Sequence, residues 1–222
     1  MSIEFILLGM SMAIALISQW NVKRAYQKYV QVRATANING FQVAQQILAN
    51  NGITDVKVVL VPGFLSDHYN PSTKTIGLSK DIYHGSTISA ISVSAHEVGH
   101  AIQHAKRYAP VVWRGKLVPV ATISSNMAMP ICLAGVFLSL PFLIDIGILV
   151  YCGILLFHLV TLPVEFNASS RAMVQLENGF ITSSREKSDC RKMLNAAALT
   201  YVASMVTALI QLFRMILLKR RR

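Results

Sequence analysis

The chain has 222 residues, of which 53% are hydrophobic and only 14% charged, and its mean hydropathy is +0.47. A soluble domain typically carries about 25% charged residues, so these values argue against an ordinary water-soluble globule and exclude a disordered or collagen-like chain. Lys and Arg number 21 against 10 Asp and Glu, which gives a net charge of +11. In so apolar a chain, this excess is more typical of loops that flank membrane segments than of a nucleic-acid-binding surface.

The first uncharged run covers residues 5–20, and a bilayer span takes about 20 apolar residues. Basic residues follow this run immediately, at Lys23, Arg24, Lys28 and Arg33. A cleavable signal peptide carries its positive charge before the apolar core instead. We therefore expect residues 1–22 to form an uncleaved transmembrane anchor whose N-terminus lies outside and whose C-terminal flank lies in the cytoplasm.

Residues 117–164 contain two further apolar runs, and Asp145 is the only charged residue between them. A connection without Lys or Arg predicts a two-span transmembrane hairpin whose turn faces away from the cytoplasm. Basic residues flank the hairpin on both sides. Residues 23–116 and 165–192 are therefore expected on the same, cytoplasmic side.

The last apolar run, 193–213, ends in a basic tail, and residues 193–222 are expected to form one C-terminal apolar helix. Polar residues recur along one face of this run, at Thr200, Ser204, Thr207 and Gln211. This pattern favours a helix that packs on the cytoplasmic domain or lies in the interface, with Lys219–Arg222 on anionic lipid. The alternative is a fourth span, which would place the basic tail outside.

The segment 23–116 is long enough for a small domain. Its residue pattern predicts a helix, two strands and a second helix, which suggests an α+β domain. These elements are expected at residues 38–50, 56–61, 74–79 and about 87–105, with a turn at Asp67–Pro71 between the strands.

The second of these helices carries His96-Glu97-Val98-Gly99-His100. Histidines four residues apart project from one helix face and can hold a single Zn²⁺. Zinc lowers the pKa of bound water to about 7, and Glu97 can accept the proton as the oxygen attacks a carbonyl. The alternative is a solvent-facing helix with this pattern by accident, but the surrounding residues are small or aliphatic, as in a buried helix.

A catalytic zinc site needs a third protein ligand, and Glu165 is the best candidate. It follows the third apolar run, so the topology places it on the same side as His96, and on a helix Ala168 and Ala172 would share its face. Such a face could approach the zinc helix closely. The alternative is an interfacial glutamate that caps a helix after Pro163.

The other histidines are weaker candidates. His104 is one turn too far along the helix, His158 lies within the third apolar run, and His68 and His84 are in predicted loops, where either could orient a substrate carbonyl. Candidates for stabilising the transition state are His68, Asn167 and Arg171.

The anchor, HEVGHAIQH at 96–104, the hairpin and LPVEFNAS at 162–169 together resemble the YugP-type neutral zinc membrane metallopeptidases of bacteria, over nearly the whole chain. The pattern is more distantly similar to the HtpX-type and CAAX prenyl membrane proteases, which place HExxH on a cytoplasmic helix and a ligand glutamate in an ExxAD motif. The resemblance implies zinc ligands and a general base. These are His96, His100 and Glu165 as ligands and Glu97 as the base.

The chain departs from the ExxAD motif at one position, because the aspartate falls on Ser169. An acid there would orient a zinc-bound imidazole through its free N–H. Ser169 can accept such a hydrogen bond but carries no charge, so Asn167 or another group is an alternative partner.

The expected fold is therefore mainly α, with transmembrane helices plus a small α+β, zincin-like cytoplasmic catalytic domain. The expected function is that of a membrane-bound zinc metalloendopeptidase of the bacterial plasma membrane, with the active site facing the cytoplasm. Its partners would be a protein or peptide substrate and the lipid bilayer, but no nucleic acid. A non-catalytic zinc-binding membrane scaffold or regulator is the alternative, and a transport or channel subunit ranks last because intramembrane charges are few.

The resemblance also suggests a role for the strand predicted at 74–79. In zinc peptidases of this type, an edge strand beside the zinc helix pairs with the extended substrate. The alternative is a plain strand within the sheet.

Overall fold

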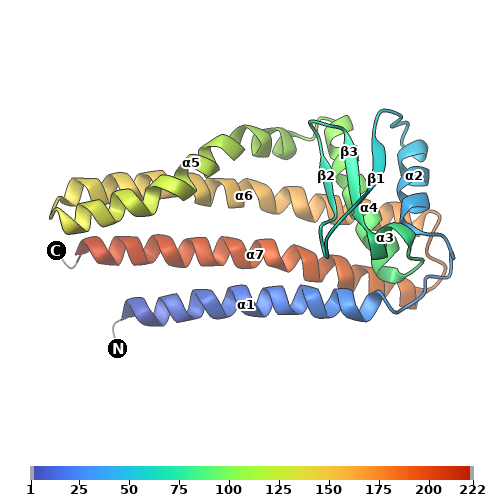
Figure 1. Cartoon of the computed structure of the whole chain (residues 1–222), viewed down its shortest axis with the longest axis horizontal. Helices are drawn as coiled ribbons and strands as arrows, with labels where there is room; N and C mark the ends of the chain where they lie inside the picture. The colour runs from blue at the N-terminus through green and yellow to red at the C-terminus, as the bar shows by residue number, and fades with distance from the viewer. Residues whose placement is uncertain (1–2, 221–222) are drawn as a thin grey trace. The chain divides into compact units, whose positions relative to one another are not determined.

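Long apolar helices and one small sheet make up most of the chain (Figure 1), which is mainly helical in a computed structural model that describes residues 3–220. In chain order, the elements are α1 (Ile3–Tyr29), α2 (Gly40–Asn50), β1 (Lys57–Val61), β2 (His68–Asn70), β3 (Thr75–Ser79), α3 (Lys80–His84), α4 (Ile88–Ala105), α5 (Ala109–Phe137), α6 (Pro141–Glu177) and α7 (Ser184–Arg220). Arg221 and Arg222, which end the predicted basic tail, lie outside the described residues.

The chain divides into two compact units. Within the described range, the apolar unit comprises residues 3–19, 109–163 and 199–220, and the sheet unit comprises Trp20–Tyr108 and Val164–Ala198. Helices α1, α6 and α7 contribute residues to both units.

In the described range, four helices are long and apolar enough to cross a membrane, namely α1, α5, α6 and α7. Pro141 occupies the first position of α6, where its missing N–H costs no helical hydrogen bond. Buried Cys132, Ile144 and Met215 pack α5, α6 and α7 together. The Nζ of Lys219 lies 2.6 Å from the Oδ1 of Asp145, so the end of α7 meets the start of α6.

The polar face of α7 lies against other helices of the apolar unit. Ser204, Thr207 and Gln211 line an open cavity of about 440 Å³ together with Ser11 of α1 and His158 of α6. Residues 199–220 therefore pack with the apolar helices, whereas the expectation was a helix that packs on the cytoplasmic domain or lies in the interface. The helix also begins earlier than expected, at Ser184. Both findings favour the alternative of a fourth span, because polar side chains in a membrane helix face the bundle interior.

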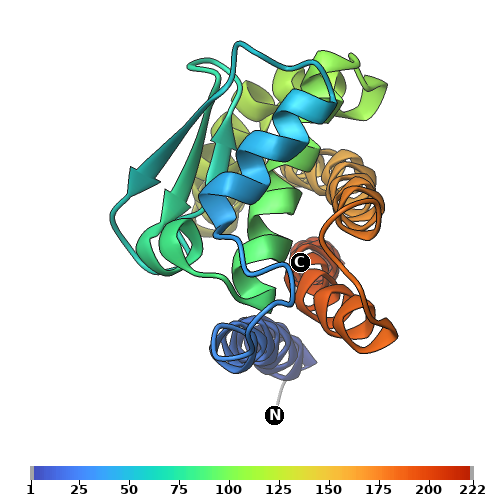
Figure 2. The same cartoon turned by 90° about the vertical axis from the view of Figure 1, so that its right-hand side faces the viewer.

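The sheet unit is built on a three-stranded sheet with strand order β1-β3-β2. Strand β3 pairs parallel with β1 and antiparallel with β2, and Ile76 of β3 lies opposite both Val58 and Tyr69. Helices α2 and α4 pack together on one face of this sheet (Figure 2). The core between these elements is formed by buried aliphatic side chains, including those of Val43, Ile47, Ile76, Leu78, Ile91, Ala95 and Val98.

Local signals place helices α2 and α4 close to where the sequence predicts them. Asn39 caps α2 in a reciprocal pair with Gln42, and Gly52 follows the helix with φ of +69°. Thr87 caps α4 by accepting a hydrogen bond from the backbone N–H of Ala90. The Thr87 cap fixes the start of the helix that carries His96 and His100.

The strand β2 occupies a stretch that the sequence predicts as a turn. The turn instead follows it, where the Oδ1 of Asn70 accepts hydrogen bonds from the backbone N–H groups of Ser72 and Thr73 and Lys74 has φ of +51°. A three-residue strand shows no alternation long enough to be recognised. The prediction of only two strands was therefore wrong.

The strand predicted at 74–79 is present as β3, but it is not an edge strand. It lies between β1 and β2, so its backbone is paired on both sides and cannot receive a substrate. The expectation of an edge strand was wrong, and the plain-strand alternative is correct. The two edges are β1 and β2, and β2 is the one that contacts α4.

Helices α4 and α6 approach closely at Gly99. A Cβ atom added there would lie 2.6 Å from the carbonyl oxygen of Ala168, which is closer than van der Waals contact allows. Ala168 and Ala172 are fully buried. This confirms the prediction that the small face around Glu165 can approach the zinc helix.

Replacing Gly99 with Ala should therefore push α4 and α6 apart and destabilise the protein by about 1–3 kcal/mol, the usual cost of overpacking. The measurement is thermal unfolding in detergent. Gly115→Ala is the matched control, since nothing lies within 4 Å of that position in α5. An exposed helical Gly→Ala change stabilises by up to about 1 kcal/mol, so equal stabilisation by both substitutions would contradict the close approach.

Candidate metal centre

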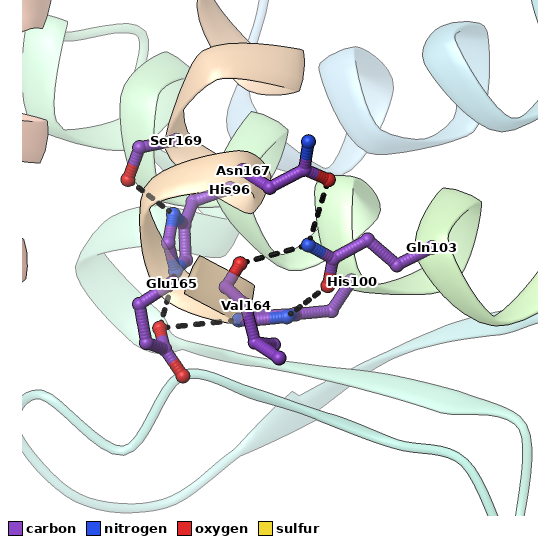
Figure 3. Close-up of polar contacts among 7 residues, drawn as sticks. All are labelled: His96, His100, Gln103, Val164, Glu165, Asn167 and Ser169. Carbon is purple, nitrogen blue, oxygen red and sulfur yellow. Dashed lines mark hydrogen bonds and ion pairs between the residues drawn. The ribbon is translucent and has the colours of Figure 1, made fainter. Parts of the chain in front are cut away.

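Three side chains from two helices meet in the sheet unit. His96 and His100 project from α4 and Glu165 projects from α6, and their potential ligand atoms all lie within 4.8 Å of one another (Figure 3). The Oε2 of Glu165 is 3.4 Å from the Nε2 of His96 and 3.5 Å from the Nε2 of His100. The structure thus brings together the three residues that the sequence singles out as ligand candidates.

The Glu165 carboxylate is only 1% exposed, and the two imidazoles are 13% and 12% exposed. A buried carboxylate is costly unless positive charge lies beside it. Two imidazole nitrogens and one carboxylate oxygen form a ligand set that is typical of catalytic zinc. The residues present therefore fit a divalent metal ion of this kind.

Helix α6 continues without interruption from Pro141 through Pro163 to Glu177. Glu165 therefore lies in the interior of a long helix, where the backbone N–H groups are already bonded. The alternative interpretation, in which Glu165 caps a helix that begins after Pro163, was wrong.

Both imidazoles have a polar partner on the nitrogen that faces away from Glu165. The Nδ1 of His96 lies 3.2 Å from the Oγ of Ser169, and the Nδ1 of His100 lies 3.1 Å from the Oε1 of Gln103 (Figure 3). The proposed contact of Ser169 with a ligand imidazole is therefore present. Such partners fix the orientation of metal-binding histidines.

Gln103 is the residue that sequence reasoning missed. It is fully buried, and its Nε2 donates hydrogen bonds to the carbonyl oxygen of Val164 at 2.7 Å and to the Oδ1 of Asn167 at 3.0 Å. The available signal was its spacing, because a residue three positions after His100 lies on the same helix face.

The field inside the site favours positive charge. Burial alone would lower the pKa of His100, but the hydrogen bond to Glu165 and the negative charges of Glu97 and Glu165 outweigh burial and raise this pKa. A raised histidine pKa reports a negative local potential. The same potential would attract a metal cation.

Glu97 follows His96 on α4 and is 8% exposed. A second carboxylate, Asp67, lies near it in the loop before β2. Asp67 accepts hydrogen bonds from the backbone N–H and the hydroxyl of Ser79 at 2.7 and 3.1 Å. Burial raises the pKa of Asp67 despite these bonds, and the charge of Glu97 adds to the increase.

The remaining candidates lie outside the group of three. His104 packs on the ring of Tyr69 in β2, with ring centroids 5.5 Å apart, and His68 lies on β2 itself. His84 packs against the ring of Tyr83 in α3, and His158 lines the cavity of the apolar unit. Asn167 and Arg171, two candidates for stabilising the transition state, hydrogen-bond to each other through Arg171 Nε and Asn167 Oδ1 at 2.7 Å.

Comparisons with known sequences identify the family to which a chain with this site and these helices belongs. Residues 4–220 match the family described as "Putative neutral zinc metallopeptidase", and the chain belongs to this family. The chain is also 43% identical over 202 residues to a Bacillus subtilis (strain 168) protein named "Putative membrane protease YugP". The aligned residues cover 90% of this chain and 89% of the relative. No solved structure matches the chain. The predicted family is thus confirmed.

If Glu165 is the third ligand, Glu165→Ala should lose most of its bound zinc, because two imidazoles alone hold the ion weakly. Elemental analysis of zinc per chain in detergent measures this. Glu177→Ala on the same helix is the control, since Glu177 is exposed and paired with Lys187. Full zinc occupancy in Glu165→Ala would place the third ligand elsewhere.

Proposed function

We propose that the protein is a membrane-bound zinc metalloendopeptidase that hydrolyses peptide bonds, with Glu97 as the general base. The observation that carries the proposal is the buried meeting of His96, His100 and Glu165, with Glu97 next to the first of them. Membership of a zinc metallopeptidase family supports it. The "membrane protease" name of the similar Bacillus subtilis protein supports the substrate class.

In this proposal His96, His100 and Glu165 hold the ion. When bound, zinc would polarise the carbonyl of the scissile peptide bond and make a nearby water molecule more acidic. Glu97 accepts the proton as the water oxygen bonds to the carbonyl carbon, and it passes that proton to the amide nitrogen as the C–N bond breaks. Ser169 and Gln103 keep the two imidazoles oriented throughout.

The free edge of β2 is the proposed binding place for the substrate backbone. Among the described strands, β2 is the edge strand that contacts α4, the helix of His96 and His100. An extended peptide that pairs with a sheet edge is held by its main chain, which tolerates many sequences. We propose that the sheet unit is in this sense a zincin-like catalytic domain.

We further propose that the sheet unit faces the cytoplasm and that all four apolar helices span the bacterial plasma membrane. The absence of Lys and Arg from the α5–α6 connection and the basic residues after α1 support this orientation. The ion pair between Lys219 and Asp145 supports a full crossing by α7, because it joins the end of α7 to the start of α6.

Glu97→Gln should retain zinc but lose activity by at least about 10²- to 10⁴-fold, the usual contribution of a general base. The assay is cleavage of an unfolded protein by the purified protein in detergent, with zinc content measured on the same sample. Undiminished cleavage would remove this mechanism. No cleavage by zinc-loaded wild type of any unfolded substrate would favour the scaffold alternative.

The proposed topology predicts which positions react with a membrane-impermeant maleimide in intact protoplasts. In a background with Cys132, Cys152 and Cys190 replaced by Ala, Leu138→Cys between α5 and α6 should react, and so should Arg220→Cys at the end of α7. Lys57→Cys in β1 should react only after lysis. Labelling of Lys57→Cys in intact protoplasts would show that the sheet unit lies outside the cytoplasm. Protection of Arg220→Cys would exclude a fourth span.

A further inference from the structure

A chain of hydrogen bonds leads from Arg171 to the metal-facing His100. The Nε of Arg171 donates to the Oδ1 of Asn167 at 2.7 Å, and the Nε2 of Gln103 donates to the same oxygen at 3.0 Å. The Oε1 of Gln103 then lies 3.1 Å from the Nδ1 of His100. All four residues belong to the sheet unit.

The direction of this chain is set by groups that have only one role. An arginine side chain can only donate, so the Asn167 atom that meets it must be the oxygen. A backbone carbonyl can only accept, so the Gln103 atom that meets Val164 must be the NH₂ group. The other end of the Gln103 amide is therefore its oxygen, and it can only accept a proton from His100.

We propose that Arg171 is a positioning residue: it fixes the Asn167 oxygen that, together with Val164, holds the Gln103 amide with its oxygen toward His100. It thereby helps to keep the proton of His100 on Nδ1 and the lone pair of Nε2 toward the metal. The inference rests on the proposed zinc site. His96 has no such polarised partner, because the hydroxyl of Ser169 can donate or accept. The two histidine ligands are therefore held by different means.

The same chain joins the two helices that supply the ligands. Gln103 of α4 bonds to Val164, the residue directly before Glu165 in α6. Gln103 is fully buried, so the loss of its partners would leave polar groups unsatisfied in the protein interior. One amide thus orients His100 and fixes the helical turn that carries Glu165.

Electrostatic attraction alone does not explain why the positively charged Arg171 lies near the proposed zinc site. The guanidinium of Arg171 lies 5.8 Å from the ring centroid of Tyr108 and lines a cavity of about 220 Å³ together with Lys106. A positive charge near a zinc ion repels it, so its removal should strengthen zinc binding by Coulomb's law. The hydrogen-bond chain predicts the opposite effect, namely that removal of the Arg171 side chain weakens zinc binding.

The test compares zinc affinity, measured by competition with a chelator, in the full-length protein in detergent. Arg171→Met should weaken zinc binding by about 10- to 100-fold, the usual effect of losing a partner behind a ligand. Lys106→Met is the matched control, because Lys106 lines the same cavity but lies outside the chain. It should leave zinc affinity unchanged or slightly higher. Equal affinities in the two variants would overturn the proposal.

Asn167 provides a second test that does not depend on losing a charge. Asn167→Asp keeps an oxygen for both donors and should bind zinc at least as tightly as wild type, whereas Asn167→Leu removes the acceptor and should weaken binding like Arg171→Met. Because the three residues act in one chain, the double variant Arg171→Met/Asn167→Leu should be no weaker than the weaker single variant. Additive losses would contradict a single chain.

If Arg171 had only a structural role, its replacement would lower the stability of the protein without changing the exchange of the His100 proton. In zinc-loaded protein labelled with ¹⁵N-histidine, the Nδ1–H of His100 should exchange slowly in wild type and in Lys106→Met but rapidly in Arg171→Met. Unchanged exchange would overturn the proposal. The positioning role alone fails if wild type binds zinc and Glu97→Gln abolishes cleavage but Arg171→Met behaves as wild type. By contrast, zinc retained by Glu165→Ala would reject the proposed zinc site itself.

Discussion

The site depends on how closely two helices can approach each other. Glu165 reaches the imidazoles of α4 only because Gly99 lets the backbone of Ala168 come nearer than a Cβ atom would permit. Ala168 and Ala172 continue the small surface on the other helix. Because α4 is fixed at its start by the Thr87 cap and held on the sheet through its buried aliphatic face, the approach is made by two rigid elements. Side chains on loops would hold such a geometry less precisely.

The arrangement also solves an electrostatic problem. A carboxylate that is 1% exposed is unfavourable in a protein interior unless compensated. The negative charge is here shared between two imidazoles, whose outer nitrogens are satisfied by Ser169 and Gln103. The outer nitrogen of each imidazole therefore has an assigned neighbour, and the remaining negative potential suits a cation. Buried charges with a specific charged partner are frequent at functional sites.

Much of the site could be predicted because it follows from spacing and topology. The four-residue spacing of His96 and His100 determines that they share a helix face, and the hairpin of apolar runs returns Glu165 to the same unit. Spacing alone places Gln103 on the helix face of His100, but its hydrogen bonds to Val164 and Asn167 depend on how α6 lies against α4, which no local pattern encodes. The short strand β2 and the central position of β3 were likewise hidden, because strand order is decided by packing in three dimensions. The polar face of α7 was visible, but its partners Ser11 and His158 are far away in the sequence.

The shortness of β2 has a consequence for the behaviour of the protein in the cell. An unpaired strand edge is a template on which other chains can extend a sheet, and long, flat edges promote aggregation. With only three residues, from His68 to Asn70, β2 exposes too little backbone to stabilise a lasting intermolecular sheet. It can still offer a few main-chain groups to a single extended segment. The edge beside α4 thus gives intermolecular strand pairing less backbone than a longer strand would.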